Sequence, residues 1–205
     1  MMRKLLIPLL VLGLSLIGYA FALTRVSPER NALRQEQGIG TVVPSPVARI
    51  IALEFKGLFA DVIFSRAMTY YGRKIMKNEH LTSEEWDWLF KSMMAATDLD
   101  PYFFDPYYFG AMNLAWEARR VTEANALLEK AFRCRHWDWN FPFYLGFNYF
   151  YFLNDSEKAS YYLLEAAKRP GGSRGLVPTL AARFAQKAGR TEIAVLYLDM
   201  FVYVF

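Results

Sequence analysis

The chain has 205 residues, of which 54% are hydrophobic and 17% aromatic, with 12 glycines and 9 prolines. This composition excludes a disordered, collagen-like or low-complexity chain. A single cysteine and two histidines exclude an internal disulfide framework and a cysteine-based zinc module, and the net charge of +4 comes without the basic stripe that indicates nucleic-acid binding.

An uncharged segment of 19 residues, 5–23, follows a basic N-terminus. As a helix it would span about 28 Å, which suits the apolar core of a thin bilayer. The basic flank predicts that the N-terminus stays in the cytoplasm. A small-x-small sequence at 20–22 also fits a signal-peptide cleavage site, so residues 1–23 are either a transmembrane anchor or a cleaved signal peptide. The anchored form predicts a single-pass protein of a bacterial inner (cytoplasmic) membrane, with the remaining chain on the periplasmic, extracytoplasmic side.

Residues 24–46 have the character of a linker with one short helix, because a Ser-Pro start signal and a later glycine bound a helical stretch. Residues 47–74 contain no proline and predict one long amphipathic helix, and a helix lying in the membrane interface is the alternative. Its expected apolar set is Ile50, Leu53, Leu58, Val62 and Met68. A second helix is predicted to begin at the capping box of Thr82 and Glu85 and to end before Pro101.

Small and apolar residues recur with a period of 35 in the second half of the chain. The columns are Ala124, Ala159 and Ala194; Leu128, Leu163 and Leu198; Ala96, Ala131 and Ala166 with Phe201; Leu127, Tyr162 and Tyr197; and Asn113 and Asn148. This period predicts pairs of antiparallel helices, in which a small residue lets the second helix approach the first. Each pair exposes an apolar face that the next pair covers, so stacking builds one continuous core.

The pattern resembles the tetratricopeptide repeat (TPR). The residues that follow the spacing of that family most closely are Leu180-Ala181, Gly189, Ala194 and Leu198. Residues 96–101 are similar to its usual repeat ending, and Leu145-Gly146 matches its small-residue position with an offset of one. The resemblance implies an all-α fold, in which residues 47–205 form a TPR-like α-α superhelix of about three to four helix pairs. It also implies that partners lie in a concave groove lined by the first helix of each pair.

The expected first helices are rich in aromatic residues, with seven in 102–116 and eight in 141–152. A buried stripe needs only three or four large residues per two turns, and excess Trp and Tyr suit an interface. The predicted partner-binding groove contains Phe109, Asn113, Trp116, Tyr144, Asn148, Tyr151, Phe152 and Arg183. The two asparagines are expected to hydrogen-bond successive peptide groups of an extended ligand. The alternative is that the aromatics fill a wide core and the asparagines satisfy helix ends.

The sequence shows no arrangement typical of an enzyme. Cys134 and His136 are two residues apart at a helix end and point away from each other, which argues against a nucleophile and its base. The glycine-rich loop 170–175 lacks the preceding strand and the Gly-Lys-Ser/Thr ending of a phosphate-binding loop, and it fits a turn between repeat units. We therefore expect no catalytic activity, no cofactor and no metal site.

Together these features predict a membrane-tethered adaptor or scaffold that binds a protein or peptide segment in an aromatic groove. The alternative is a self-associating structural subunit of an envelope assembly. The chain ends in an apolar run that includes Phe201, Val204 and Phe205, and a terminal repeat normally needs a polar outer face.

Overall fold

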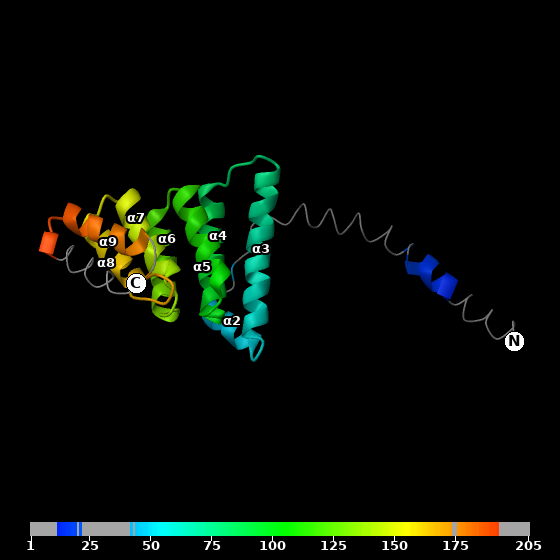
Figure 1. The fold of residues 1–205 in the computed structure, drawn as a ribbon. Helices are drawn as coiled ribbons and strands as arrows, with labels where there is room; N and C mark the ends of the chain where they lie inside the picture. Colours follow the sequence, from blue (N-terminus) through cyan, green and yellow to red (C-terminus); the bar gives the residue numbers. More distant parts are fainter. Residues whose placement is uncertain (1–11, 20, 22–41, 43, 174–175, 193–205) are drawn as a thin grey trace. The chain divides into compact units, whose positions relative to one another are not determined.

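The structure, a computed structural model, describes residues 12–19, 21, 42, 44–173 and 176–192. The chain divides into two compact units, 1–41 and 42–205. In the first unit, residues 12–19 and 21 are helical (Figure 1). No helix of the described part of the chain is both long enough and apolar enough to cross a membrane. Most of the predicted anchor and linker lies outside the described residues.

Every regular element that the structure describes in the second unit is an α-helix, which confirms the all-α prediction. The helices are α2 (Ser45–Ala52), α3 (Lys56–Met76), α4 (Ser83–Leu99), α5 (Phe104–Trp116), α6 (Val121–Cys134), α7 (Asn140–Tyr151), α8 (Ser156–Ala167) and α9 (Leu176–Lys187). Neighbouring helices pack side by side in chain order from α3 to α9 (Figure 1). From α4 to α8 the connections have only four or five residues, so consecutive helices run antiparallel.

The predicted single helix over 47–74 is wrong, because the chain breaks between α2 and α3. Leu53 adopts a left-handed backbone conformation with φ of 47° and ends α2. The break lets both helices place small residues on α4, where Ala48, Ala52 and Ala60 are buried with Ala96 and Leu99. Of the predicted apolar set, Ile50, Leu53, Leu58 and Val62 are exposed, whereas Met68 is half-buried and packs against the core.

The alanine and leucine columns at 96/131/166, 124/159 and 128/163 occupy equivalent places in the core, as the sequence predicts. Ala96 in α4, Ala131 in α6 and Ala166 in α8 are fully buried. The pairs Ala124 and Ala159, and Leu128 and Leu163, are also buried. Thus α4, α6 and α8 are the second helices of successive pairs, and α5 and α7 are first helices. The column members at 194, 197, 198 and 201 lie outside the described residues.

Two glycines mark the closest approaches between helices. A Cβ on Gly110 of α5 would lie 2.8 Å from Met93 Cγ of α4 and 2.9 Å from Leu127 Cδ1 of α6. A Cβ on Gly146 of α7 would lie 2.7 Å from Leu163 Cγ and 3.0 Å from the carbonyl oxygen of Ala159, both in α8. The small-residue contact predicted between the helices of a pair is therefore present between α7 and α8.

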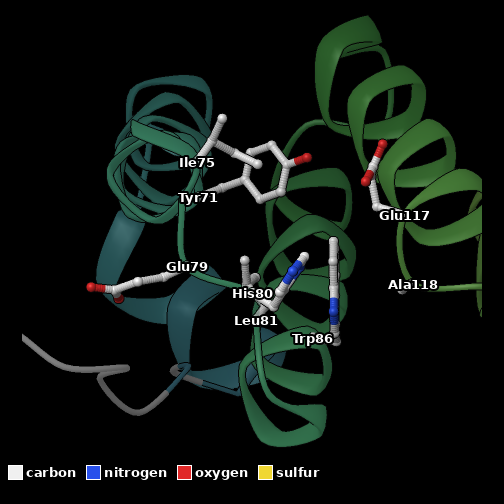
Figure 2. Close-up of a pocket in the computed structure, with 8 residues that line it drawn as sticks. All are labelled: Tyr71, Ile75, Glu79, His80, Leu81, Trp86, Glu117 and Ala118. Atoms are coloured by element: carbon white, nitrogen blue, oxygen red, sulfur yellow. The ribbon is translucent and has the colours of Figure 1, made fainter. Parts of the chain in front are cut away.

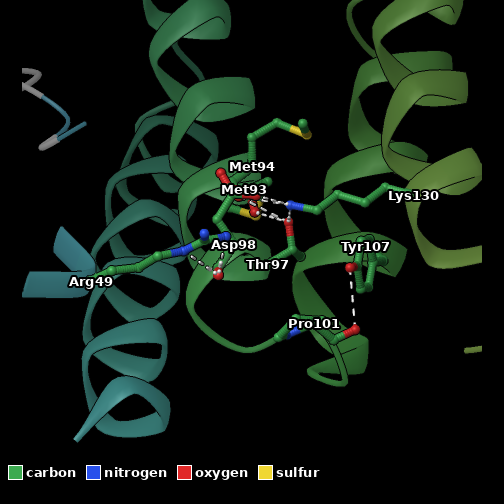
Figure 3. Close-up of polar contacts among 8 residues, drawn as sticks. All are labelled: Arg49, Met93, Met94, Thr97, Asp98, Pro101, Tyr107 and Lys130. Atoms are coloured by element: carbon green, nitrogen blue, oxygen red, sulfur yellow. Dashed lines mark hydrogen bonds and ion pairs between the residues drawn. The ribbon is translucent and has the colours of Figure 1, made fainter. Parts of the chain in front are cut away.

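A polar cluster fixes the C-terminal end of α4 to its neighbours (Figure 3). Lys130 Nζ of α6 donates to Thr97 Oγ1 at 2.8 Å and to Asp98 Oδ1 at 2.5 Å. Arg49 of α2 donates to the backbone oxygen of Asp98 at 3.0 and 3.2 Å. Basic side chains at the C-terminal end of a helix donate hydrogen bonds to its last carbonyl groups, and their positive charge interacts favourably with the negative end of the helix dipole. The cluster therefore holds α2, α4 and α6 in a defined arrangement.

The other end of α4 begins with the predicted capping box, which is confirmed. Thr82 Oγ1 accepts a hydrogen bond from the Glu85 backbone at 3.3 Å, and Glu85 Oε2 accepts one from the Thr82 backbone at 2.6 Å. The buried Glu85 carboxylate also accepts a hydrogen bond from the Tyr70 hydroxyl and pairs with Lys74 at 3.0 Å. Burial raises the pKa of the Glu85 carboxyl, but these hydrogen bonds outweigh it and lower the pKa to about 2.

Replacing Glu85 with glutamine is expected to lower the free energy of unfolding near neutral pH by on the order of 1–3 kcal/mol. The folded-state pKa of about 2 lies below the ordinary value of 4.5. The carboxylate therefore stabilises the fold fully above about pH 4.5 and loses this contribution as the pH falls toward 2. Urea unfolding of the wild type and Glu85→Gln should consequently converge in that window. The control is Glu84→Gln at the exposed neighbouring residue, which should change stability by less than about 1 kcal/mol. A stability difference between the wild type and Glu85→Gln that did not depend on pH would contradict the prediction.

Candidate partner-binding surface

Aromatic side chains cluster at the C-terminal ends of α5 and α7. We call Trp116, Phe147, Tyr151 and Phe152 the aromatic surface. The ring of Trp116 lies 5.3 Å from Tyr151 and 5.2 Å from Phe152, centre to centre. Phe147 stacks on Tyr151 at 5.6 Å. The four rings thus form one connected cluster across two successive helix pairs.

The two largest members of the aromatic surface remain open to solvent. Trp116 is 40% exposed and Tyr151 is 52% exposed. They are the last residues of α5 and α7 and are 35 residues apart, so the repeat itself brings them together. The guanidinium of Arg119 lies 5.6 Å from the centre of the Phe152 ring and gives one edge of the surface a positive charge.

Two other predicted groove residues, Phe109 and Tyr144, lie nearer the starts of α5 and α7. Both contact Tyr108, whose ring centre is 5.3 Å from Phe109 and 5.6 Å from Tyr144. Phe109 is exposed, whereas Tyr144 is half-buried. Burial, reinforced by the neighbouring Tyr108, raises the pKa of Tyr144 to about 12. Arg183 is exposed on α9, and none of the described contacts joins it to the aromatic surface.

The predicted asparagine pair is not equivalent in the structure. Asn148 is 1% exposed, and its side-chain amide donates to Asn125 Oδ1 of α6 at 2.8 Å. Asn148 therefore lies in the interior and does not face a groove, which corrects the prediction. Asn113 is half-buried, and one period before Asn125 the chain has Phe90, which cannot accept the same hydrogen bond. The burial of the two asparagines therefore differs because the position that holds Asn125 opposite Asn148 holds a phenylalanine one period earlier.

A pocket lies where the segment that follows α5 approaches α3, α4 and their connection (Figure 2). It has a volume of about 230 Å³ and is lined by Tyr71, Ile75, Glu79, His80, Leu81, Trp86, Glu117 and Ala118. Glu117 directly follows Trp116, so α5 ends between the pocket and the aromatic surface.

The chemistry of the pocket favours a cationic group. The rings of Tyr71 and Trp86 form a wall with centres 5.9 Å apart. The carboxylate of Glu117 points toward the Tyr71 hydroxyl, whereas Glu79 turns away and pairs with Lys74 at 3.2 Å (Figure 2). Burial and the negative charge of Glu117 raise the pKa of Tyr71. Aromatic faces beside a carboxylate attract ammonium and guanidinium groups.

The sequence pattern did not predict this pocket, because its lining comes from two helices and two connections. The glycine-rich loop, in contrast, is a turn between α8 and α9 over its described residues 170–173, as predicted. Gly171 has φ of 85°, and a Cβ on Gly172 would collide with the carbonyl oxygen of Ala166. The two glycines therefore serve the turn. Phe201, Val204 and Phe205, the residues expected to mediate self-association, lie outside the described residues.

Comparison of the chain with protein-family models, with curated proteins and with solved structures finds no match. The tetratricopeptide resemblance therefore stays a prediction, which depends on the 35-residue period and its buried columns.

Proposed function

We propose that the chain is a membrane-tethered adaptor of tetratricopeptide-like architecture, and that its aromatic surface binds a segment of a partner protein. The observation that supports this most is the exposure of Trp116 and Tyr151 at equivalent ends of two successive first helices. Rings of this size are costly to leave in water, at about 25 cal/mol per Å² of apolar surface. They also lose little conformational entropy on binding, so they are frequent anchors of protein interfaces.

The pocket suggests the character of the bound segment. An apolar or aromatic side chain of the partner would pack on Trp116 and Tyr151, and a lysine or arginine would enter between Tyr71 and Glu117. Both contacts use side chains that the fold has already ordered, which reduces the entropic cost of binding. Asn148 takes no part, because its amide is already paired inside the domain.

The tether is supported by the segment that precedes the helical domain. Residues 5–23 carry no charge and follow a basic flank, which favours a single span of an inner membrane with the domain on the periplasmic side. An adaptor held in this way would raise the local concentration of its partner at the membrane.

Replacing Trp116 and Tyr151 together with alanine is expected to weaken partner binding at least about tenfold, since each residue has the character of an interface hot spot. The test is photo-crosslinking of the full chain in membranes, followed by identification of captured proteins. The control is Tyr161→Ala, which removes a tyrosine that is also 52% exposed but lies on α8. An unchanged set of captured proteins in the double variant would contradict the proposal, provided that its circular dichroism spectrum matches that of the wild type.

A further inference from the structure

The hairpin of α2 and α3 exposes an unusual amount of apolar surface. Seven large hydrophobic side chains between positions 47 and 62 are each 45–73% exposed. They are Val47, Ile50, Ile51, Leu53, Phe55, Leu58 and Val62, which we call the apolar corner. Scattered exposed hydrophobic residues are normal, but seven within 16 consecutive positions are the kind of group that marks a binding or membrane-contacting surface.

At the apolar corner, α2 buries its small side chains and exposes its large apolar ones, the reverse of the usual arrangement. On α2, the side chains that face α4 are Ala48 and Ala52, while Ile50 and Ile51 point away from it. On α3, Ala60 is buried and Phe59 and Ile63 are partly buried against the same cluster, whereas Leu58 and Val62 are exposed. A helix that only needs to cover a core buries its large apolar residues and exposes polar ones. On α2 only small side chains are buried and the large apolar ones are exposed, which is the arrangement of a helix that has a second contact outside the domain.

The exposed side chains are held outward by specific interactions. Arg49 donates two hydrogen bonds to the backbone oxygen of Asp98, and this fixes the rotation of α2 on α4 (Figure 3). The backbone nitrogen of Phe55 donates to the backbone oxygen of Ala52 at 2.7 Å and defines the turn between the helices. These hydrogen bonds hold the corner in one arrangement, with the exposed Leu53 and Phe55 in the turn between α2 and α3.

We propose that the apolar corner inserts into the membrane interface. This inference rests on the proposed tether, because residues 24–44 between the uncharged segment and α2 can extend at most about 75 Å. With the proposed tether, the length of this segment limits how far α2 can lie from the bilayer. A helix pair with one large apolar side buries it at the boundary of headgroups and acyl chains.

The charges of the corner further specify the kind of membrane contact. Arg49 is engaged with α4, and the remaining charges near the tip, Glu54 and Lys56, have opposite signs. Attraction to anionic lipid is therefore weak, and burial of apolar surface drives the contact. Docking of the corner consequently needs neither anionic lipid nor low salt.

The experiment places spin labels on the full chain in vesicles of phosphatidylcholine, with Cys134→Ser removing the native thiol. Labels are attached through Ile50→Cys, Phe55→Cys and Leu58→Cys, which are all exposed positions. The control is Glu157→Cys, an exposed site on α8. We expect the three corner labels to lose relaxation by a water-soluble nickel chelate and to keep relaxation by oxygen, whereas the control label keeps both.

Nickel-chelate relaxation at the corner labels equal to that of the control would overturn the proposal. Protection of these labels without any vesicles would overturn it as well, because a second copy of the chain would then cover the corner. The result is independent of the aromatic surface, since a Phe55→Glu, Leu58→Glu double variant should lose the membrane contact and still capture the partner. Loss of partner capture only in the Trp116 and Tyr151 variant tests the adaptor separately.

Discussion

Replacing Phe141 with alanine is expected to lower the free energy of unfolding by about 3–5 kcal/mol, the cost of truncating a fully buried aromatic side chain. Phe141 is 0% exposed at the start of α7. Its ring centre lies 5.2 Å from that of Phe104 and 5.7 Å from that of Tyr107, both in α5. The residue therefore packs the first helix of one pair against the first helix of the next, and its removal leaves a cavity at the contact on which stacking depends.

The measurement is urea-induced unfolding followed by circular dichroism, with the midpoints compared at equal slope. Tyr161→Ala is the control, because this aromatic side chain is half exposed on α8, and the expected change is within about 0.5 kcal/mol. Similar small losses in both variants would show that the contact between pairs depends little on Phe141. Loss of cooperativity in Phe141→Ala alone would instead show that successive pairs unfold separately once this contact is weakened.

The repeat could be predicted from the sequence because each of its buried alanine and leucine columns has one physical role. Ala131 and Ala166 must be small for neighbouring helices to approach, and Leu128 and Leu163 must be large to fill the adjoining layer. Such requirements recur with every pair, so the period is visible without any structure. The capping box of Thr82 and Glu85 was predictable for a similar reason, since it depends only on residues three apart.

Features that depend on contacts between different elements could not be predicted in this way. Asn113 and Asn148 are the same residue type one period apart, which suggested that they have the same role. Their surroundings differ because Asn148 hydrogen-bonds to Asn125, a residue of another helix that lies 23 positions earlier in the chain. The pocket beside Trp86 is likewise assembled from distant segments.

The first helices show a further limit of pattern-based prediction. The hydrophobic pattern of residues 47–74 placed Ile50 and Leu58 in the apolar set of one amphipathic helix, and the apolar set of such a helix usually faces the core. The structure buries Ala48, Ala52 and Ala60 instead. A periodic pattern divides a helix into an apolar and a polar face. It does not tell whether the apolar face packs against the domain or against another apolar surface outside it. The inversion at the apolar corner is therefore informative about function.

The close contact between α7 and α8 leads to opposite expectations for two helical glycines. Gly146→Ala is expected to destabilise the fold by about 1–3 kcal/mol, because the new methyl group would meet Leu163 and the backbone of Ala159. Gly72→Ala in α3 is expected to stabilise it by about 0.5–1 kcal/mol, since nothing lies within 4 Å of its Cβ position and alanine favours the helix.

Both variants make the same chemical change inside a helix, so each is the control for the other in urea unfolding. Helix propensity alone predicts a gain at both positions, whereas the packing argument predicts a loss at Gly146 and a gain at Gly72. A gain at both would mean that α7 and α8 can separate without cost, and the small-residue contact would then not explain the repeat. A loss at Gly146 alone would show that a small residue is required where the first helix of a pair packs against the second.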